Sequence, residues 1–227
     1  MMVQRCYVLL MFSWVFLFSF STAYANGNAQ EVTEKLSNIE YYSENLVDSI
    51  LAKDTVDSKK LYENIQQNLD QLHRIFSGDA FDERKSRELL LAYSWLRVIA
   101  VDMNQGSRIG VAIAANQLSA SMIRSLNYPT LFQRDTAWMG YLCRELLLLN
   151  IEGDSMNRQL LDARRIDLID TWFRLRIELS KKDFRNKTLA IHGNNLITLL
   201  QGEHDSKVTM KTAKKLLQLI DEIKQVE

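Results

Sequence analysis

Pro129 is the single proline in a chain of 227 residues, and no other feature constrains the fold as strongly. Sheet proteins of this length usually need more turn-forming residues than this chain supplies. Glycines instead follow apolar stretches, at Gly78, Gly106, Gly153 and Gly202. Glycine adopts the left-handed conformation that ends a helix without a steric penalty. The chain is therefore predicted to be all-α.

Residues typical of helix N-termini follow two of these glycines and the proline. Asp82 is one predicted N-cap, Asp154 or Ser155 is another, and Thr130 with Gln133 three residues later forms a capping-box pattern. Between these marks the apolar residues recur at helical spacing. We expect a multi-helix bundle or a short α-solenoid of about eight helices. The predicted helices span residues 30–52, 57–77, 82–104, 107–127, 131–152, 155–181, 184–201 and 207–225.

Residues 1–25 have the pattern of a secretory signal peptide rather than of a folded segment. Arg5 precedes an apolar run at residues 6–20, and Ala23 and Ala25 stand at the −3 and −1 positions of a cleavage site. The alternative is an uncleaved membrane anchor, but the apolar run is shorter than the roughly 20 residues that span a bilayer. We therefore expect export, with residues 26–227 forming a single all-helical domain.

Cysteine usage and charge narrow the expected location and partners. Cleavage removes Cys6 and leaves Cys143 as the one thiol, so the mature chain has no internal disulfide and depends on a hydrophobic core. This favours a bacterial periplasm over the eukaryotic secretory route. The 28 basic and 28 acidic side chains lose only Arg5 on cleavage, which leaves a net charge of about −1. Such a chain lacks the basic surface typical of nucleic-acid binding.

Two distant segments of the chain have similar sequences. The stretch "SWLRV" at residues 94–98 matches "TWFRL" at residues 171–175, and "VAIAANQL" at residues 111–118 matches "LAIHGNNL" at residues 189–196. A tryptophan, arginines and an asparagine recur in the same order, which chance similarity between amphipathic helices explains poorly. We interpret this as an internal duplication of a three-helix unit. The two units span about residues 57–127 and 131–201, and helices at about 30–52 and 207–225 flank them.

The repeated polar and aromatic residues are the candidate site. Asn116 and Asn194 each stand in an apolar, small-residue stretch, where a buried amide must find hydrogen-bond partners. Arg97 and Arg174 in the preceding helices are possible partners, and either packing or a ligand pocket would satisfy the pattern. Trp95 and Trp172 are most simply core aromatics, with ligand stacking as the alternative. Small residues such as Ala115 and Gly193, which align in the two copies, indicate close helix approach.

Motifs for cofactor, metal or covalent chemistry are weak. Asp70-x-x-His73 occurs once, whereas a helical di-metal site needs the pattern twice with further carboxylates. Cys143 lies in an apolar helix without a recognisable partner histidine, and His192 has no counterpart in the first copy. The sequence contains no phosphate-binding loop, dinucleotide motif or nucleophile elbow. We therefore expect no cofactor, no metal site and no catalytic residues.

These observations predict an exported, periplasmic, non-catalytic helical protein. The leading hypothesis is a binding or scaffolding module whose partner is an envelope protein or a second copy of the chain. The alternative is a carrier or sensor of a small molecule or metal, with a polar pocket near Asn116 and Asn194. An enzyme is the third possibility. We expect neither a nucleic-acid partner nor a membrane span after signal cleavage.

The cleavage site gives the first testable prediction. Ala23-Tyr24-Ala25 predicts a mature protein that begins at Asn26. N-terminal sequencing of exported material should return Asn-Gly-Asn. A membrane-extracted chain that still begins near Met1 would establish the anchor interpretation instead.

Overall fold

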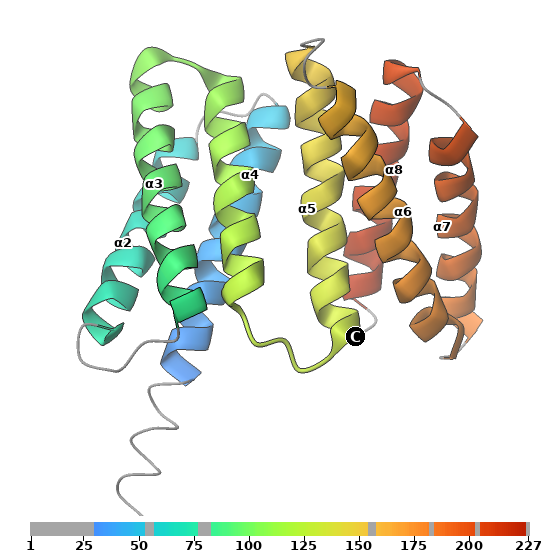
Figure 1. The fold of residues 1–227 in the computed structure, drawn as a ribbon, viewed down its shortest axis with the longest axis horizontal. Helices are drawn as coiled ribbons and strands as arrows, with labels where there is room; N and C mark the ends of the chain where they lie inside the picture. The colour runs from blue at the N-terminus through green and yellow to red at the C-terminus, as the bar shows by residue number, and fades with distance from the viewer. Residues whose placement is uncertain are drawn as a thin grey trace, which may run out of the picture.

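The computed structural model describes residues 30–52, 57–76, 83–153, 158–181, 184–202 and 205–225. Over these ranges the chain forms eight α-helices and no strand, which confirms the all-α prediction (Figure 1). A first helix spans residues 30–51 and is called helix 30–51 here. The others are α2 (Ser58–Phe76), α3 (Glu83–Gln105), α4 (Arg108–Ser125), α5 (Leu131–Glu152), α6 (Arg158–Lys181), α7 (Phe184–Gly202) and α8 (Ser206–Lys224).

Three of the predicted helix ends have the local chemistry that the sequence indicates. Gly106 and Gly153 follow α3 and α5 with φ angles of 71° and 68°. The side chain of Thr130 accepts a hydrogen bond of 3.1 Å from the backbone N–H of Gln133, which caps α5. Gly202 is a correction, because it is still the last helical residue of α7 and does not have a positive φ.

Several predictions lie outside the described residues. The signal peptide at residues 1–25 and its cleavage site are among them, as are Gly78, Asp82, Asp154 and Ser155. Across the ranges that the structure does describe, no helix is both long and apolar enough to cross a membrane.

The helices form two adjoining groups. Helix 30–51 and α2 to α4 form most of one hydrophobic core, and α5 to α8 form most of the other. Ala120 and Ile123 of α4 belong to the second core, and Leu148 of α5 belongs to the first. The groups meet where α4 packs against α5, and Leu51 and Tyr128 contact both cores. In Figure 1, α3, α4, α5 and α6 lie side by side at the front, with α2 and α7 toward the two edges. The result is a helical bundle in which α4 and α5 occupy the centre.

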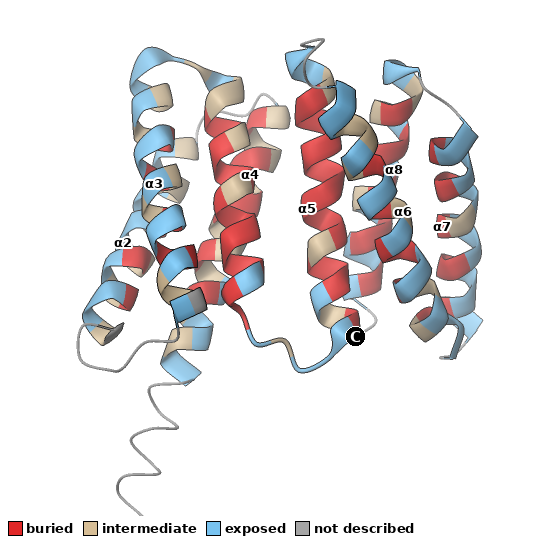
Figure 2. Cartoon of the chain, in the orientation of Figure 1, coloured by how far each residue is buried: buried red, intermediate tan, exposed pale blue. Residues whose placement is uncertain are grey.

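The apolar pattern of each helix follows from this arrangement. In α2, Ile65, Leu69 and Leu72 are fully buried and the opposite face is exposed, as the spacing predicts. The residues of α5 from Met139 to Leu149 are buried all around the helix, and Figure 2 shows this helix as almost continuously buried. A helix with neighbours on every side needs apolar residues on every side. The central position of α5 explains why its sequence lacks a polar face.

Close helix approach is confirmed at Gly193. Trp172 of α6 is fully buried, and its six-membered ring lies against the backbone of Gly193 in α7. A Cβ atom at position 193 would overlap three carbons of this ring. Glycine is therefore required here by contact with a tryptophan rather than by a backbone angle.

Gly193→Ala should destabilise the protein by about 1–3 kcal/mol, because the added methyl group forces Trp172 out of its packed position. Gly202→Ala is the matched control in the same helix, since no atom of the described residues lies within 4 Å of a Cβ at that position. Urea unfolding of both variants, followed by tryptophan fluorescence, measures the difference. Equal midpoints for the two variants would contradict the packing account.

Candidate functional site

The asparagine of the second repeat copy makes an interhelical hydrogen bond. The indole Nε1 of Trp172 in α6 donates to Asn194 Oδ1 in α7 at 2.9 Å. Because Trp172 is fully buried, this acceptor satisfies a donor that water does not reach. Trp172 and Asn194 thus join α6 to α7 by a hydrogen bond next to the ring–backbone contact.

The asparagine of the first copy contacts a different helix. Asn116 in α4 is buried, and its Nδ2 donates to the backbone oxygen of Tyr141 at 3.4 Å and to Glu145 Oε2 at 3.3 Å, both in α5. Both neighbours are acceptors, so the amide nitrogen must face them. Its Oδ1 has no hydrogen-bond partner among the described residues. Asn116 therefore joins the two helix groups, whereas Asn194 lies within one of them.

The predicted arginine partners of these asparagines are wrong. Arg97 is exposed on α3, and Arg174 donates to Asp135 and Thr171 rather than to Asn194. Trp95 is only partly buried, at the margin of the first core. The structure thus brings Trp172 and Asn194 together but not the six residues as two equivalent sites. The duplication of the three-helix unit stays a prediction from the sequence.

A small cleft does lie beside Asn116. It has a volume of about 170 Å³ and is lined by Asn116, Gln117, Glu145, Glu152 and four leucine or isoleucine side chains. Ligand sites for small molecules usually span roughly 300–1,000 Å³. The Glu145 carboxylate already accepts hydrogen bonds from Gln117 at 2.9 Å and from Arg164 at 3.2 Å, so it is not free to bind a ligand. This cleft is a poor match to the polar ligand pocket expected near Asn116.

Arg174 lines a larger pocket, which has a volume of about 580 Å³. The pocket lies at the end of the bundle where α4 ends and α5 begins. We call it the arginine pocket. Its charged lining consists of Arg87 and Glu88 of α3, Arg124 of α4, Arg134 and Asp135 of α5, and Arg174 of α6. Its apolar lining is Ile123, Leu126, Tyr128, Leu131 and Trp138. The pocket therefore joins cationic and apolar surface, and both helix groups contribute to it.

Two arginines of the pocket have matching contacts. Arg124 Nε donates to Glu88 Oε2 at 3.0 Å, and its Nη2 donates to Ser121 Oγ at 3.2 Å. Arg174 Nε donates to Asp135 Oδ2 at 2.7 Å, and its Nη2 donates to Thr171 Oγ1 at 3.2 Å. We call these the Arg124 pair and the Arg174 pair. Each guanidinium is oriented by a carboxylate on the neighbouring helix and by a hydroxyl three residues earlier.

The carboxylates of both pairs are buried while the arginines reach solvent. The Glu88 and Asp135 side chains are 5% and 6% exposed, whereas those of Arg124 and Arg174 are 40% and 52% exposed. Arg134 Nη2 adds a second contact to Asp135, at 3.1 Å from Oδ1. Four arginines against two carboxylates leave an excess of two positive charges in the pocket. Such a surface attracts oxyanions, which guanidinium groups bind in a planar, bidentate manner.

Sequence reasoning did not identify Arg87, Glu88, Arg124, Arg134 or Asp135 as site residues. One signal was available, because Ser121-x-x-Arg124 and Thr171-x-x-Arg174 share a hydroxyl-to-arginine spacing of one helical turn. The acidic partners could not be found this way, since Glu88 and Asp135 belong to other helices.

Tyr128 of the pocket connects it to a second polar cluster. Its hydroxyl donates to Glu40 Oε2 of helix 30–51 at 3.0 Å. Burial and the neighbouring Glu44 raise the pKa of Glu40 to about 7, against the opposing effects of Tyr128, Lys224 and Arg144. The Glu40 carboxyl therefore stays protonated until the pH approaches about 7.

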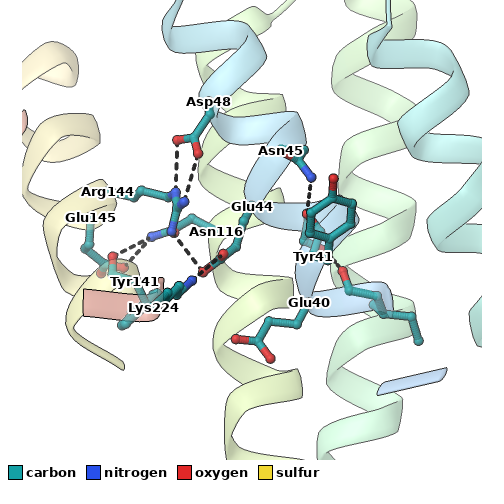
Figure 3. Close-up of polar contacts among 12 residues, drawn as sticks. Glu40, Tyr41, Glu44, Asn45, Asp48, Asn116, Tyr141, Arg144, Glu145 and Lys224 are labelled. Atoms are coloured by element: carbon teal, nitrogen blue, oxygen red, sulfur yellow. Dashed lines mark hydrogen bonds and ion pairs between the residues drawn. The ribbon is translucent and has the colours of Figure 1, made fainter. Parts of the chain in front are cut away.

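Arg144 is the centre of this second cluster (Figure 3). Its Nη1 donates to Glu44 Oε1 at 2.9 Å, and its Nε and Nη2 donate to the two oxygens of Asp48 at 3.0 and 2.8 Å. Lys224 of α8 lies 3.4 Å from the other oxygen of Glu44. Burial alone would lower the pKa of Arg144, but Glu44 and Asp48 raise it above its ordinary value. Arg144 stays charged, and each of its three guanidinium nitrogens donates to a carboxylate of helix 30–51.

Cys143, His73 and His192 do not line the arginine pocket. Cys143 is fully buried, and burial raises the pKa of its thiol to about 12 despite the adjacent Arg144. His73 and His192 are exposed on different helices. Within the described ranges no three histidine, cysteine or acidic side chains are grouped to bind a metal ion.

Comparison of the chain with protein-family models, with curated proteins and with solved structures gives no match. Inferences about function therefore depend on the geometry of the chain itself.

The raised pKa of Glu40 predicts a specific dependence of stability on pH. The unfolded chain loses this proton near the ordinary value of 4.5, whereas the folded chain keeps it to about 7. As pH rises through this window, the folded state therefore loses at most about 3 kcal/mol of stability relative to the unfolded state. Glu40→Gln mimics the protonated carboxyl, so the variant should not show this loss.

Chemical unfolding of wild type and Glu40→Gln at several pH values between about 4.5 and 8 measures this effect. The stability difference should move in favour of the variant as pH rises and then stay constant above about pH 7. Glu222→Gln, at an exposed position of α8, is the control and should follow the wild type. Parallel curves for Glu40→Gln and wild type would disprove the assignment.

Proposed function

We propose that this protein is a non-catalytic binding module of the periplasm that takes an anionic ligand in the arginine pocket. The observation that carries the proposal is the pocket itself. Its volume of about 580 Å³ lies within the range of small-molecule sites, and four arginines line it beside apolar side chains. Export rests on the signal-peptide pattern of residues 1–25.

The arginines retain donors for a ligand. A guanidinium has five N–H groups, and the contacts of Arg124 and Arg174 within the described part of the chain use Nε and Nη2. The Nη1 groups are thus unoccupied by those contacts. Because Glu88 and Asp135 bind the Nε atoms, the guanidinium planes are oriented before a ligand arrives. Preorganised donors lose less conformational entropy on binding.

The surroundings of the ionisable groups support binding rather than catalysis. The carboxylates of the pocket are buried and already bonded to arginines, so they are poorly placed to exchange protons with a ligand. The thiol of Cys143 has a pKa of about 12 and is protonated at neutral pH. Thiol nucleophiles act as thiolates. A ligand held by fixed guanidinium groups and an apolar wall is bound and released unchanged.

Citrate is a suitable first probe, because it carries several carboxylates and tests anion binding without assuming a geometry. At constant ionic strength, citrate should raise the melting temperature of the wild type. Ligand at about 100 times Kd contributes about 2.7 kcal/mol. This corresponds to a shift of roughly 5–11 °C for a domain of this size. The double variant Arg124→Met/Arg174→Met should lose most of the shift.

Arg97→Met is the matched control, since Arg97 is exposed on α3 and does not line the pocket. The shift caused by citrate, rather than the melting temperature without it, is compared among the three proteins. An absent shift in the wild type, or an equal shift in wild type and double variant, would refute the proposal.

Binding of an envelope protein partner is the second candidate. Ile166, Phe173 and Ile177 are 58%, 37% and 54% exposed at helical spacing on α6. Exposed apolar rows of this kind often mark protein contacts. Affinity capture of the tagged protein from its native envelope tests this candidate, and Ile166→Glu/Ile177→Glu serves as the negative control.

A further inference from the structure

We propose that the ligand of the arginine pocket is a small dianion whose two oxyanion groups bind the Arg124 pair and the Arg174 pair, with an apolar body between them. This inference rests on the proposed function and specifies the class of ligand. Its basis is that one contact pattern occurs twice in the lining of a single pocket, once from each helix group.

The two pairs come from different helix groups. Glu88 and Arg124 belong to α3 and α4, whereas Asp135 and Arg174 belong to α5 and α6. Each arginine donates Nε to a buried carboxylate and Nη2 to a hydroxyl one turn earlier. The same edge of each guanidinium is therefore occupied, and the same Nη1 group is left for a ligand. Two equivalent binding groups in one pocket favour a ligand with two equivalent anionic groups.

The net charge around each arginine pair also supports a dianionic ligand. The first side has Arg87 and Arg124 with one carboxylate, Glu88, and the second has Arg134 and Arg174 with one carboxylate, Asp135. Each side thus carries a single excess positive charge. One carboxylate, or one singly ionised phosphoryl group, neutralises one side. A monoanion would leave the other side uncompensated, and a dianion compensates both.

The apolar part of the pocket lining specifies the rest of the ligand. Trp138, Leu126 and Leu131 belong to the same pocket and offer apolar contact. A volume of about 580 Å³ is far more than one bare oxyanion occupies, so an inorganic phosphate or sulfate ion would leave this lining wet. A short carbon chain or ring that carries an oxyanion at each end fills the space and contacts the apolar wall.

Calorimetric titration of the purified protein at constant ionic strength tests the inference. The probes are linear α,ω-dicarboxylates from succinate to suberate and the monocarboxylates of the same chain lengths. An alkane bisphosphonate series distinguishes phosphoryl from carboxylate groups. One dicarboxylate or bisphosphonate length should bind at least about tenfold more tightly than its monoanionic counterpart, because a second charged contact contributes 1.4 kcal/mol or more.

Variants locate the two contacts. Arg124→Met and Arg174→Met should each reduce the affinity for the dianion to that for the monoanion. In each variant the remaining arginine pair should bind the monoanion as it does in the wild type. Where either variant fails to fold, Arg87→Met and Arg134→Met remove the same charge without breaking the Nε contacts. Each should reduce the preference for the dianion by about tenfold. Arg97→Met is the control and should bind like the wild type.

The outcomes separate this inference from the proposed function. Equal affinities for dianions and monoanions would overturn the two-contact inference while leaving an anion-binding pocket. Binding of citrate without binding of any dicarboxylate or bisphosphonate would also overturn it, and would point to an acidic protein segment or a larger anion. If no anion binds, including citrate, both the inference and the proposed function are wrong.

Discussion

The buried guanidinium of Arg144 is the contact on which the arrangement of the two helix groups depends. A buried cation is tolerated only when carboxylates and hydrogen bonds replace its hydration shell. Arg144 of α5 obtains these from Glu44 and Asp48 of helix 30–51, about 100 residues earlier in the chain, and Lys224 of α8 binds the other oxygen of Glu44. Hydrophobic contacts between α4 and α5 permit many small displacements, whereas three directional hydrogen bonds to two carboxylates do not.

The position of the two groups in turn determines the arginine pocket. The Arg124 pair is built within the first group and the Arg174 pair within the second. Their separation therefore depends on how the groups meet, which the Arg144 contacts and the α4–α5 packing fix together. The bond from Tyr128 to Glu40 connects the pocket wall to the same helix that supplies Glu44. The separation of the two arginine pairs thus depends on these interhelical contacts.

The repeated sequence illustrates why similar residues acquired different surroundings. Helix α4 lies at the centre of the bundle, so Asn116 faces α5 of the other group. Helix α7, its counterpart in the second copy, lies toward an edge and packs on α6 and α8, so Asn194 meets Trp172. Similar sequences therefore do not produce equivalent sites when one helix is enclosed and the other is peripheral. The predicted pairing of Asn194 with Arg174 was wrong because Arg174 donates to Asp135 of α5 and to Thr171 of its own helix.

Local sequence patterns predicted the helices and the buried face of α2. Glycine after α3 and α5, the threonine cap of α5 and the apolar spacing of α2 act within a few residues, so they can be read without tertiary information. The pairing of charged groups, in contrast, depends on how the helices pack. Arg124 and Arg174 resemble other surface arginines until packing places Glu88 and Asp135 beside them, and Arg144 gives no sign of its partners in helix 30–51. Helix formation depends on local backbone and side-chain preferences, which the sequence shows directly. The partner in an ion pair depends instead on which helix surfaces burial brings together.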